Sequence, residues 1–113
     1  MNLPSKVKVG GHKFKVIFPY KFKERSDLNG QCDSILLEIR LAKFDSGGTE
    51  IAETKQLSNF LHELIHAIGF SFLSASEKSL EEVIVEGLAQ GLMAVMIDNP
   101  KLFTDLLKSK CKD

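Results

Sequence analysis

His62-Glu63-Leu64-Ile65-His66 is the segment of this sequence whose residue types and spacing can do chemistry. Two histidines four residues apart lie on one face of a helix, with Cβ atoms about 5–6 Å from each other. That separation lets both imidazole rings bind a single zinc ion at about 2.0–2.1 Å. The glutamate between them can activate a water molecule at the metal without itself being a ligand. The motif therefore predicts a hydrolytic zinc site.

The residues on both sides of the motif are uncharged and mostly apolar, from Asn59 to Leu61 before it and at Ala67-Ile68 after it. We therefore expect a buried helix. Ionisable side chains in such a helix are costly unless a partner compensates them, and a metal ion is such a partner. The simpler alternative is that both histidines are hydrogen-bonded core residues and that Glu63 is a surface charge.

The first half of the chain predicts a small antiparallel sheet of three strands. Apolar residues alternate along residues 6–19 on both sides of Gly10-Gly11, which is a two-residue hairpin signal. Alternation resumes at residues 34–41, after a turn near Gly30, and a short strand at residues 30–33 would be a fourth. The residues of segment 34–41 expected on one face are Ile35, Leu37, Ile39 and Leu41.

The second half of the chain predicts three helices. The first carries the histidine motif from about residue 49 to a terminator at Gly69. The second begins with a capping box, in which Ser79 and Glu82 each bind the other's backbone N–H. It ends before Pro100, which suits the first position of a short third helix that packs back on the domain.

A catalytic zinc site needs a third protein ligand besides His62 and His66, and it keeps one position open. The remaining histidine, His12, lies beside the predicted hairpin turn, so we expect a carboxylate from the second helix. Glu86 is preferred, because a carboxylate within so apolar a helix needs a partner. Glu82, already used by the capping box, is the alternative one turn away.

Two glycines of the second helix support this choice. Gly87 and Gly91 are poor helix formers, each costing about 1 kcal/mol relative to alanine. Glycines in mid-helix often mark close packing, so we expect the second helix to cross the first tightly and to bring Glu86 to the histidines. Otherwise Glu86 is a solvated charge or the partner of a lysine.

Composition excludes several classes of protein. The 113 residues are expected to form one domain, residues 1–113. Lysine and arginine number 15, as do aspartate and glutamate, so electrostatics favours neither nucleic acid nor an anionic membrane as a partner. Apolar runs are shorter than the roughly 20 residues of a membrane span, and the start lacks a secretion signal. Cys32 and Cys111 are expected to be free thiols in the cytoplasm, the alternative being one disulfide.

Residues 30–92 resemble the small gluzincin-type zinc peptidases that phages and prophages often encode, akin to the minimal core of the ImmA/IrrE metallopeptidase group. The histidine motif is the specific part of the resemblance. The resemblance implies a minimal zincin-like α+β fold: an antiparallel sheet of three or four strands, the motif helix, a second ligand-bearing helix and a short C-terminal helix. It also implies a glutamate on the second helix as third ligand, in a Glu-x-x-Ala/Ser setting that Glu86-Gly87-Leu88-Ala89 matches. The segments that carry it are Gly30–Asp33 with the following strand 35–41, Leu61–Ile68 and Glu82–Leu92.

The expected reaction is hydrolysis of a peptide bond in a peptide or protein substrate. Glu63 would take a proton from a zinc-activated water and pass it to the leaving amine. Tyr20 and His12 are candidates for a second oxyanion donor, although neither can be placed from the sequence. The strand 34–41 would accept the substrate as an added strand if it lies at the sheet edge.

Asp33 and Cys32 have two interpretations each. Asp33 would orient a zinc-bound histidine or form a turn. Cys32 would bind the metal reversibly or be a small buried thiol.

Two functions from other classes also fit the sequence. A zinc-stabilised binding module would keep the fold and the metal without catalysis. A structural zinc site needs no general base such as Glu63, however, and it is closed by a fourth protein ligand. An interaction protein that binds no metal is the other alternative.

Overall fold

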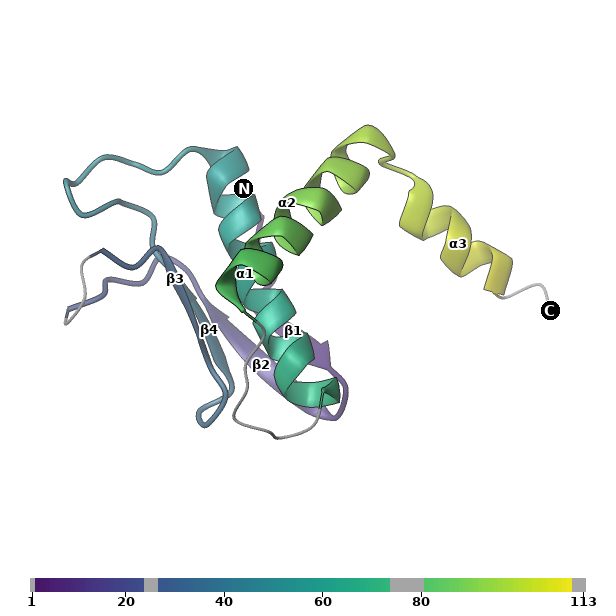
Figure 1. Ribbon diagram of the computed structural model, residues 1–113, viewed down its shortest axis with the longest axis horizontal. Coiled ribbons are helices and arrows are strands. Elements are labelled where there is room, and N and C mark those ends of the chain that lie inside the picture. The colour runs from purple at the N-terminus through teal and green to yellow at the C-terminus, as the bar shows by residue number, and fades with distance from the viewer. Residues whose placement is uncertain (1, 24–26, 74–80, 111–113) are drawn as a thin grey trace.

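The computed structural model describes residues 2–23, 27–73 and 81–110, which form four strands and three helices (Figure 1). The α+β prediction is confirmed at this level. The strands are β1 (Lys6–Val9), β2 (His12–Ile17), β3 (Gly30–Asp33) and β4 (Glu38–Leu41). The helices are α1 (Glu53–Phe72), α2 (Glu82–Asp98) and α3 (Leu102–Lys110).

The β1–β2 hairpin is confirmed where the sequence predicts it. Val9 pairs with His12 across a two-residue turn made by Gly10-Gly11. Gly10 has φ of 61°, a conformation that glycine adopts at little steric cost.

The sheet is mixed, with strand order β1-β2-β4-β3. β4 pairs with β3 in antiparallel fashion but runs parallel to β2, where Val16 pairs with Ile39. The prediction of a wholly antiparallel sheet is therefore wrong for the central pair, whereas the short fourth strand at residues 30–33 exists. Alternating apolar residues indicate a strand but not its partner. Here the β3–β4 hairpin folds so that β4, rather than β3, lies next to β2.

The segment predicted as one strand at residues 34–41 is a turn followed by the shorter β4. Oδ1 of Asp33 accepts hydrogen bonds from the backbone N–H groups of Ile35 and Leu36, at 3.0 and 2.9 Å. An aspartate side chain that binds backbone donors in this way competes with strand pairing. Leu37 has φ of 56° and Ile35 is 90% exposed, so the prediction of a continuous face from Ile35 to Leu41 is wrong.

Helix α1 lies between the sheet and α2, and both neighbours bury it (Figure 1). This position explains why its middle, from Phe60 to Ala67, has no exposed residue. The buried residues of the core come from all three layers: Val9, Phe14, Val16, Ile39 and Leu41 from the sheet, Phe60, Leu61, Ile65 and Ala67 from α1, and Val85 and Ala89 from α2.

Helix α1 continues past Gly69 to Phe72, so the predicted terminator is wrong. The carbonyl of Gly69 instead accepts the backbone N–H of Leu73 at 2.9 Å. Phe70 packs edge-on against Phe14 of the sheet, with ring centroids 6.5 Å apart. This packing offsets the cost of about 1 kcal/mol that a mid-helix glycine imposes.

Helix α2 packs on α1 through Val85 and Ala89, both fully buried. The expected tight crossing at Gly87 and Gly91 is wrong, because both glycines face away, and an added Cβ at either would meet nothing within 4 Å. Ser79 of the predicted capping box lies outside the described residues.

Helix α3 exists where predicted but extends away from the body of the molecule (Figure 1). Phe103, Leu106 and Leu107 are 46%, 58% and 64% exposed, so the prediction that α3 packs back on the domain is wrong. An apolar helical face shows that burial would be favourable, but it does not say which surface provides it. Within the described ranges, no helix combines the length and apolar character of a membrane span.

Candidate metal centre

His62 and His66 lie side by side on the face of α1 that meets α2. Their ring centroids are 5.1 Å apart, and their side chains are 17% and 19% exposed. The i, i+4 spacing thus has the geometry that the sequence predicts for a pair of ligands.

Glu82, the first residue of α2, contacts both histidines. Its Oε2 lies 2.8 Å from Nε2 of His62 and its Oε1 lies 2.9 Å from Nε2 of His66. One ligand atom from each of these three residues lies within 4.8 Å of the other two. These are the residues that the fold brings closest to a shared metal position.

Glu86 contacts the opposite side of the His62 ring. Its Oε1 lies 2.8 Å from Nδ1 of His62, and its Oε2 accepts a hydrogen bond from Nε2 of Gln90 at 3.0 Å. Each ring nitrogen of His62 therefore contacts a carboxylate oxygen. The alternative that Glu86 is merely a solvated charge is wrong.

The two candidates for third ligand are thus both at the site, with different contacts. Glu82 reaches Nε2 of both histidines, whereas the contact described for Glu86 is with Nδ1 of His62. The sequence favours Glu86 because it lies within an apolar helix and because the capping-box pattern assigns the Glu82 carboxylate to the backbone. Both oxygens of that carboxylate instead contact imidazole rings.

Glu63 points toward the edge strand β3, where its side chain lies against Gly30, and only 8% of it is exposed. The alternative that Glu63 is a surface charge is therefore wrong. Burial raises the pKa of Glu63 to about 7, with a further increase from the charge of Glu82, against an opposing effect of His62. A carboxyl group with this pKa can both accept and donate a proton near neutral pH.

The charges of His62 and its partners are coupled. Burial by itself lowers the pKa of His62, but the hydrogen bond to Glu86 and the negative charges of Glu63 and Glu82 outweigh burial, so the pKa is raised. The same hydrogen bond, together with that from Gln90, lowers the pKa of Glu86. In the metal-free protein the carboxylates around His62 therefore favour the protonated form of its ring.

The donor set fits zinc. Two imidazole nitrogens and one carboxylate oxygen are a common set of protein ligands at catalytic zinc. The ion pairs that the structure describes for Glu82 and Glu86 are with histidines rather than with lysine or arginine. The charge of Lys55 also acts on Glu86, and a divalent cation would add positive charge directly between the carboxylate of Glu82 and the imidazole rings.

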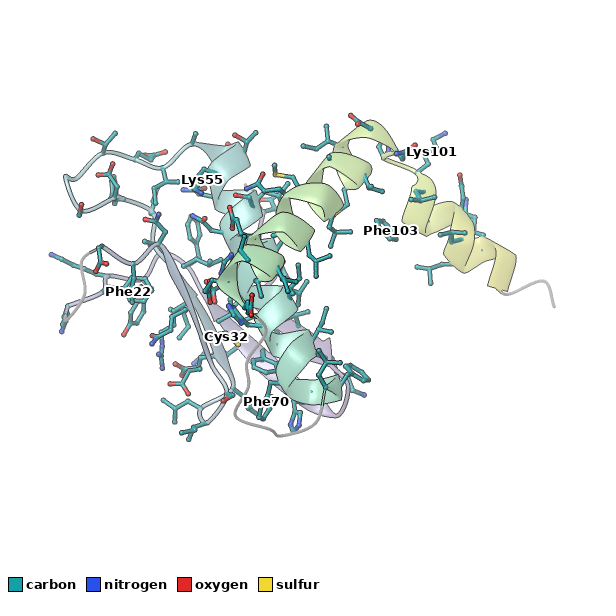
Figure 2. All side chains as sticks on the ribbon, viewed as in Figure 1. Phe22, Cys32, Lys55, Phe70, Lys101 and Phe103 are labelled. Carbon is teal, nitrogen blue, oxygen red and sulfur yellow. The ribbon has the colours of Figure 1, made fainter. Side chains whose placement is uncertain are left out.

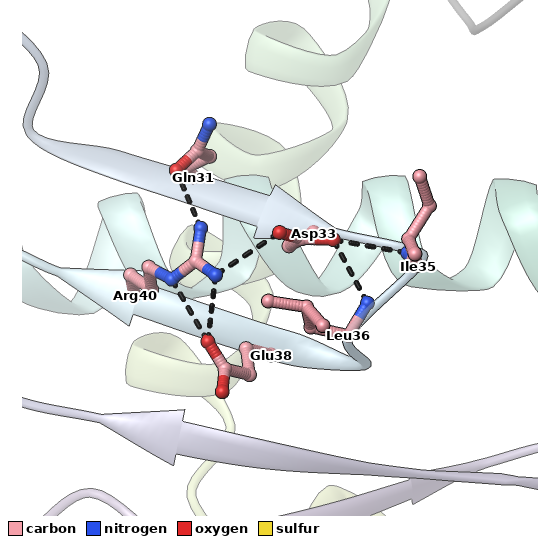
Figure 3. A network of polar contacts seen from close by, with 6 residues as sticks. All are labelled: Gln31, Asp33, Ile35, Leu36, Glu38 and Arg40. Carbon is pink, nitrogen blue, oxygen red and sulfur yellow. Dashed lines mark hydrogen bonds and ion pairs between the residues drawn. The ribbon is translucent and has the colours of Figure 1, made fainter.

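A second polar cluster occupies the opposite face of the sheet (Figure 3). Arg40 of β4 bonds Glu38 at 2.7 and 2.9 Å, Asp33 at 3.0 Å and Gln31 at 2.8 Å. Asp33 is therefore engaged by Arg40 and by the turn, and the interpretation as a turn-forming residue is the correct one. The guanidinium also lies over the ring of Tyr20, 5.5 Å from its centroid.

The remaining candidates lie apart from the histidine pair. Tyr20 stacks on Arg40 at the outer face of the sheet, and the His12 ring lies 5.3 Å from that of Phe70. Cys32 faces the core from β3 (Figure 2), and burial, with the nearby charges of Glu63 and Asp33, raises its pKa to about 12. This supports the interpretation of Cys32 as a buried thiol rather than a ligand.

Sequence reasoning missed two residues near the site. Gly30 of β3 lies against the Glu63 side chain. Asn59 precedes Glu63 by one helical turn, and its buried Nδ2 has no hydrogen-bond partner in the part of the chain that the structure describes. A polar amide in an apolar flank was the signal for Asn59, whereas the sequence pattern indicated only a turn near Gly30 and not its contact with Glu63.

The strand order shows that segment 34–41 is not the sheet edge at which a substrate strand could be added. β4, which contains the end of segment 34–41, lies inside the sheet between β2 and β3. The edge strand on this side is β3, and it is β3 that lies next to Glu63.

Comparison with known proteins adds no relative. No family model matches this chain, and neither the curated proteins nor the solved structures contain a match. The case for a function therefore rests on the residues of the site.

Proposed function

We propose that this protein is a zinc-dependent peptidase. The observation that carries the proposal is the convergence of His62, His66 and Glu82 within 4.8 Å, beside the buried carboxyl group of Glu63. Bound zinc would acidify its water to a pKa of about 7 and polarise the substrate carbonyl. This combination of ligands and base resembles the gluzincin arrangement that the sequence motif suggests.

Each residue has a distinct role in this proposal. His62 and His66 hold the metal, and a carboxylate of α2 completes the set. Glu63 accepts the proton of the attacking water and donates it to the leaving amine. In the metal-free protein its pKa is about 7, close to neutral pH, where a group can exchange protons in both directions.

A peptide is the substrate class that the fold favours. The outer edge of β3 carries backbone groups without a neighbouring strand in the described sheet, and it lies beside Glu63. An extended peptide can add to such an edge through main-chain hydrogen bonds. Bound there, the peptide backbone would pass next to the general base.

We propose Glu82 as the third ligand, with Glu86 orienting His62 through Nδ1. A group that binds the second nitrogen of a ligating histidine sets its orientation, and its loss typically costs about 10–100-fold in metal affinity. Glu86→Gln should therefore weaken zinc binding by about this much, and Glu82→Gln by more. Competition with a chromophoric chelator measures both. The opposite order would assign the ligand to Glu86, as the sequence predicts.

The decisive experiment compares wild type with Glu63→Gln on a library of fluorogenic peptides. Wild type should bind one zinc and cleave peptides, and the variant should keep zinc but lose about 10²–10⁴-fold in rate. Glu38→Gln, in the arginine-containing cluster, is the matched control and should remain active. Zinc binding without cleavage by any of the three proteins would reject the peptidase proposal.

Exposed apolar residues favour one second candidate, a zinc-stabilised docking module. Large apolar side chains lie exposed on α2 and α3. A surface of this kind often binds another protein. The residues are Val83, Ile84, Leu88, Val95, Ile97, Phe103, Leu106 and Leu107. The library experiment separates the two functions, because a docking module would bind zinc without cleaving peptides.

A further inference from the structure

Gly30 of the edge strand β3 leaves space that the Glu63 side chain occupies. A Cβ atom at residue 30 would lie 3.0 Å from Oε2 of Glu63, 3.1 Å from its Cγ and 3.2 Å from Cδ2 of Leu41. Ordinary van der Waals contacts of a Cβ atom begin at 3.4 Å. A methyl group therefore does not fit unless one of these neighbours moves.

Both neighbours are buried. Leu41 is 2% exposed and pairs with Gly30 across the β3–β4 ladder, and Glu63 is 8% exposed. Protein interiors are packed as densely as organic crystals, so an added methyl group displaces its neighbours rather than filling a void.

Backbone conformation does not explain the glycine. Among the glycines that the structure describes, Gly10 and Gly48 have positive φ and Gly30 does not. Glycine inside a strand weakens the strand, and it often marks a place where another group approaches closely. At Gly30 the approaching groups are the Glu63 side chain, with its Oε2 nearest, and Cδ2 of Leu41.

We propose that Gly30 is a positioning residue for Glu63: the bare backbone of β3 lets the carboxylate lie between the edge strand and the histidine pair. The catalytic consequence rests on the proposed function, whereas the contact itself does not. A larger residue at position 30 pushes the carboxylate away from the strand and displaces the general base. A displaced general base lowers the rate, because proton transfer needs a defined geometry between the base and the reacting water.

A double-mutant cycle tests the contact without metal or substrate. Gly30→Ala should lower the urea midpoint of the full-length protein in the wild-type background. In the Glu63→Ala background the clashing carboxylate is gone, and the same change should leave the midpoint unchanged or raise it. Gly11→Ala is the control, because a Cβ at Gly11 meets nothing within 4 Å, and its effect should be the same in both backgrounds.

The cycle remains decisive if Gly30→Ala alone does not fold. Folding restored in the double variant Gly30→Ala/Glu63→Ala would support the proposal. Equal shifts of the midpoint in both backgrounds, or a double variant that also fails to fold, would overturn it, because Leu41 rather than Glu63 would then exclude the side chain.

The catalytic consequence is tested by kinetics on a peptide that the wild type cleaves. Gly30→Ala should lower kcat about 10-fold or more, with KM and zinc content unchanged, since the substitution moves the base and not the ligands. An unchanged kcat would overturn the proposal. If the cycle shows coupling but wild type cleaves nothing, the positional contact stands and the peptidase function fails.

Discussion

Two polar clusters lie on opposite sides of the sheet and balance their charges in different ways. The arginine cluster (Gln31, Asp33, Glu38 and Arg40) surrounds a permanent cation with two carboxylates and an amide. The histidine cluster (His62, Glu63, His66, Glu82 and Glu86) has three carboxylates, and the positive charge in the ion pairs described for it comes from histidine alone.

This difference distinguishes a structural cluster from a candidate site. Arg40 is only 11% exposed at its side chain, and its donors are used by neighbours on two adjacent strands. Such a group is complete without a ligand. In the histidine cluster the ion pairs of Glu82 and Glu86 are with imidazole rings, and these carboxylates raise the pKa of His62, whereas burial is the main cause of the raised pKa of Glu63. The comparison predicts that changes in the two clusters have different consequences.

The largest expected effect is the loss of zinc affinity when a histidine is removed. His66→Ala should weaken zinc binding by about 100-fold or more, since one of three protein ligands is lost. Arg40→Met should leave zinc affinity unchanged. Chelator competition with each purified protein measures this, and equal zinc affinities for the two variants would remove the proposed distinction.

Glu63→Gln should change how the stability of the zinc-free protein depends on pH. The pKa of Glu63 is raised from 4.5 to about 7 in the folded protein, so its contribution to stability is present below pH 4.5 and is lost as pH rises toward 7. The stability of the variant lacks this dependence on pH. Its free energy of unfolding should therefore rise relative to that of wild type between pH 4.5 and about 7, by up to about 3 kcal/mol. Urea denaturation at several pH values measures the gain. A constant difference between the two proteins would contradict the assignment.

Arg40→Met should destabilise the fold by about 1–3 kcal/mol, because it leaves partly buried carboxylates without their donor. The loss should be equal with and without zinc, since this cluster lies on the other face of the sheet from the histidines. Urea unfolding under both conditions measures it. A loss that depends on zinc would mean that the two clusters are coupled through the sheet.

The smallest expected effect is the acid sensitivity of Asp33. Backbone hydrogen bonds from the turn, chiefly that of Leu36, and the contact with Arg40 lower its pKa in the folded state. Its contribution is therefore present at neutral pH and is lost as pH falls below about 4. Asp33→Asn should be less stable than wild type at pH 7, with the gap narrowing in acid. This trend is opposite to that of Glu63, and denaturation at pH 3 and pH 7 compares the two.

Features that depend on near neighbours in the chain were predicted well. The Gly10-Gly11 hairpin and the existence of three helices follow from local periodicity and turn chemistry. The predictions were wrong where another interaction competes with the local preference of the backbone. Gly69 would end an isolated helix, but Phe70 packs against the sheet and the helix continues. At residues 34–37, alternation favoured a strand, but the Asp33 side chain stabilises a turn.

By itself, the sequence determined that His62 and His66 share one helical face, and it predicted that the third ligand of a zinc ion would be a carboxylate of the second helix. The shared face follows from the 3.6-residue repeat of a helix. The carboxylate was predicted because the sequence has only one further histidine, His12. Only the tertiary structure decided that β4 lies inside the sheet, that Gly30 lies against Glu63, and which carboxylate contacts which imidazole nitrogen. These depend on how α1, α2 and the sheet pack together, because contacts between distant segments are set by the shape of the whole core rather than by spacing along the chain.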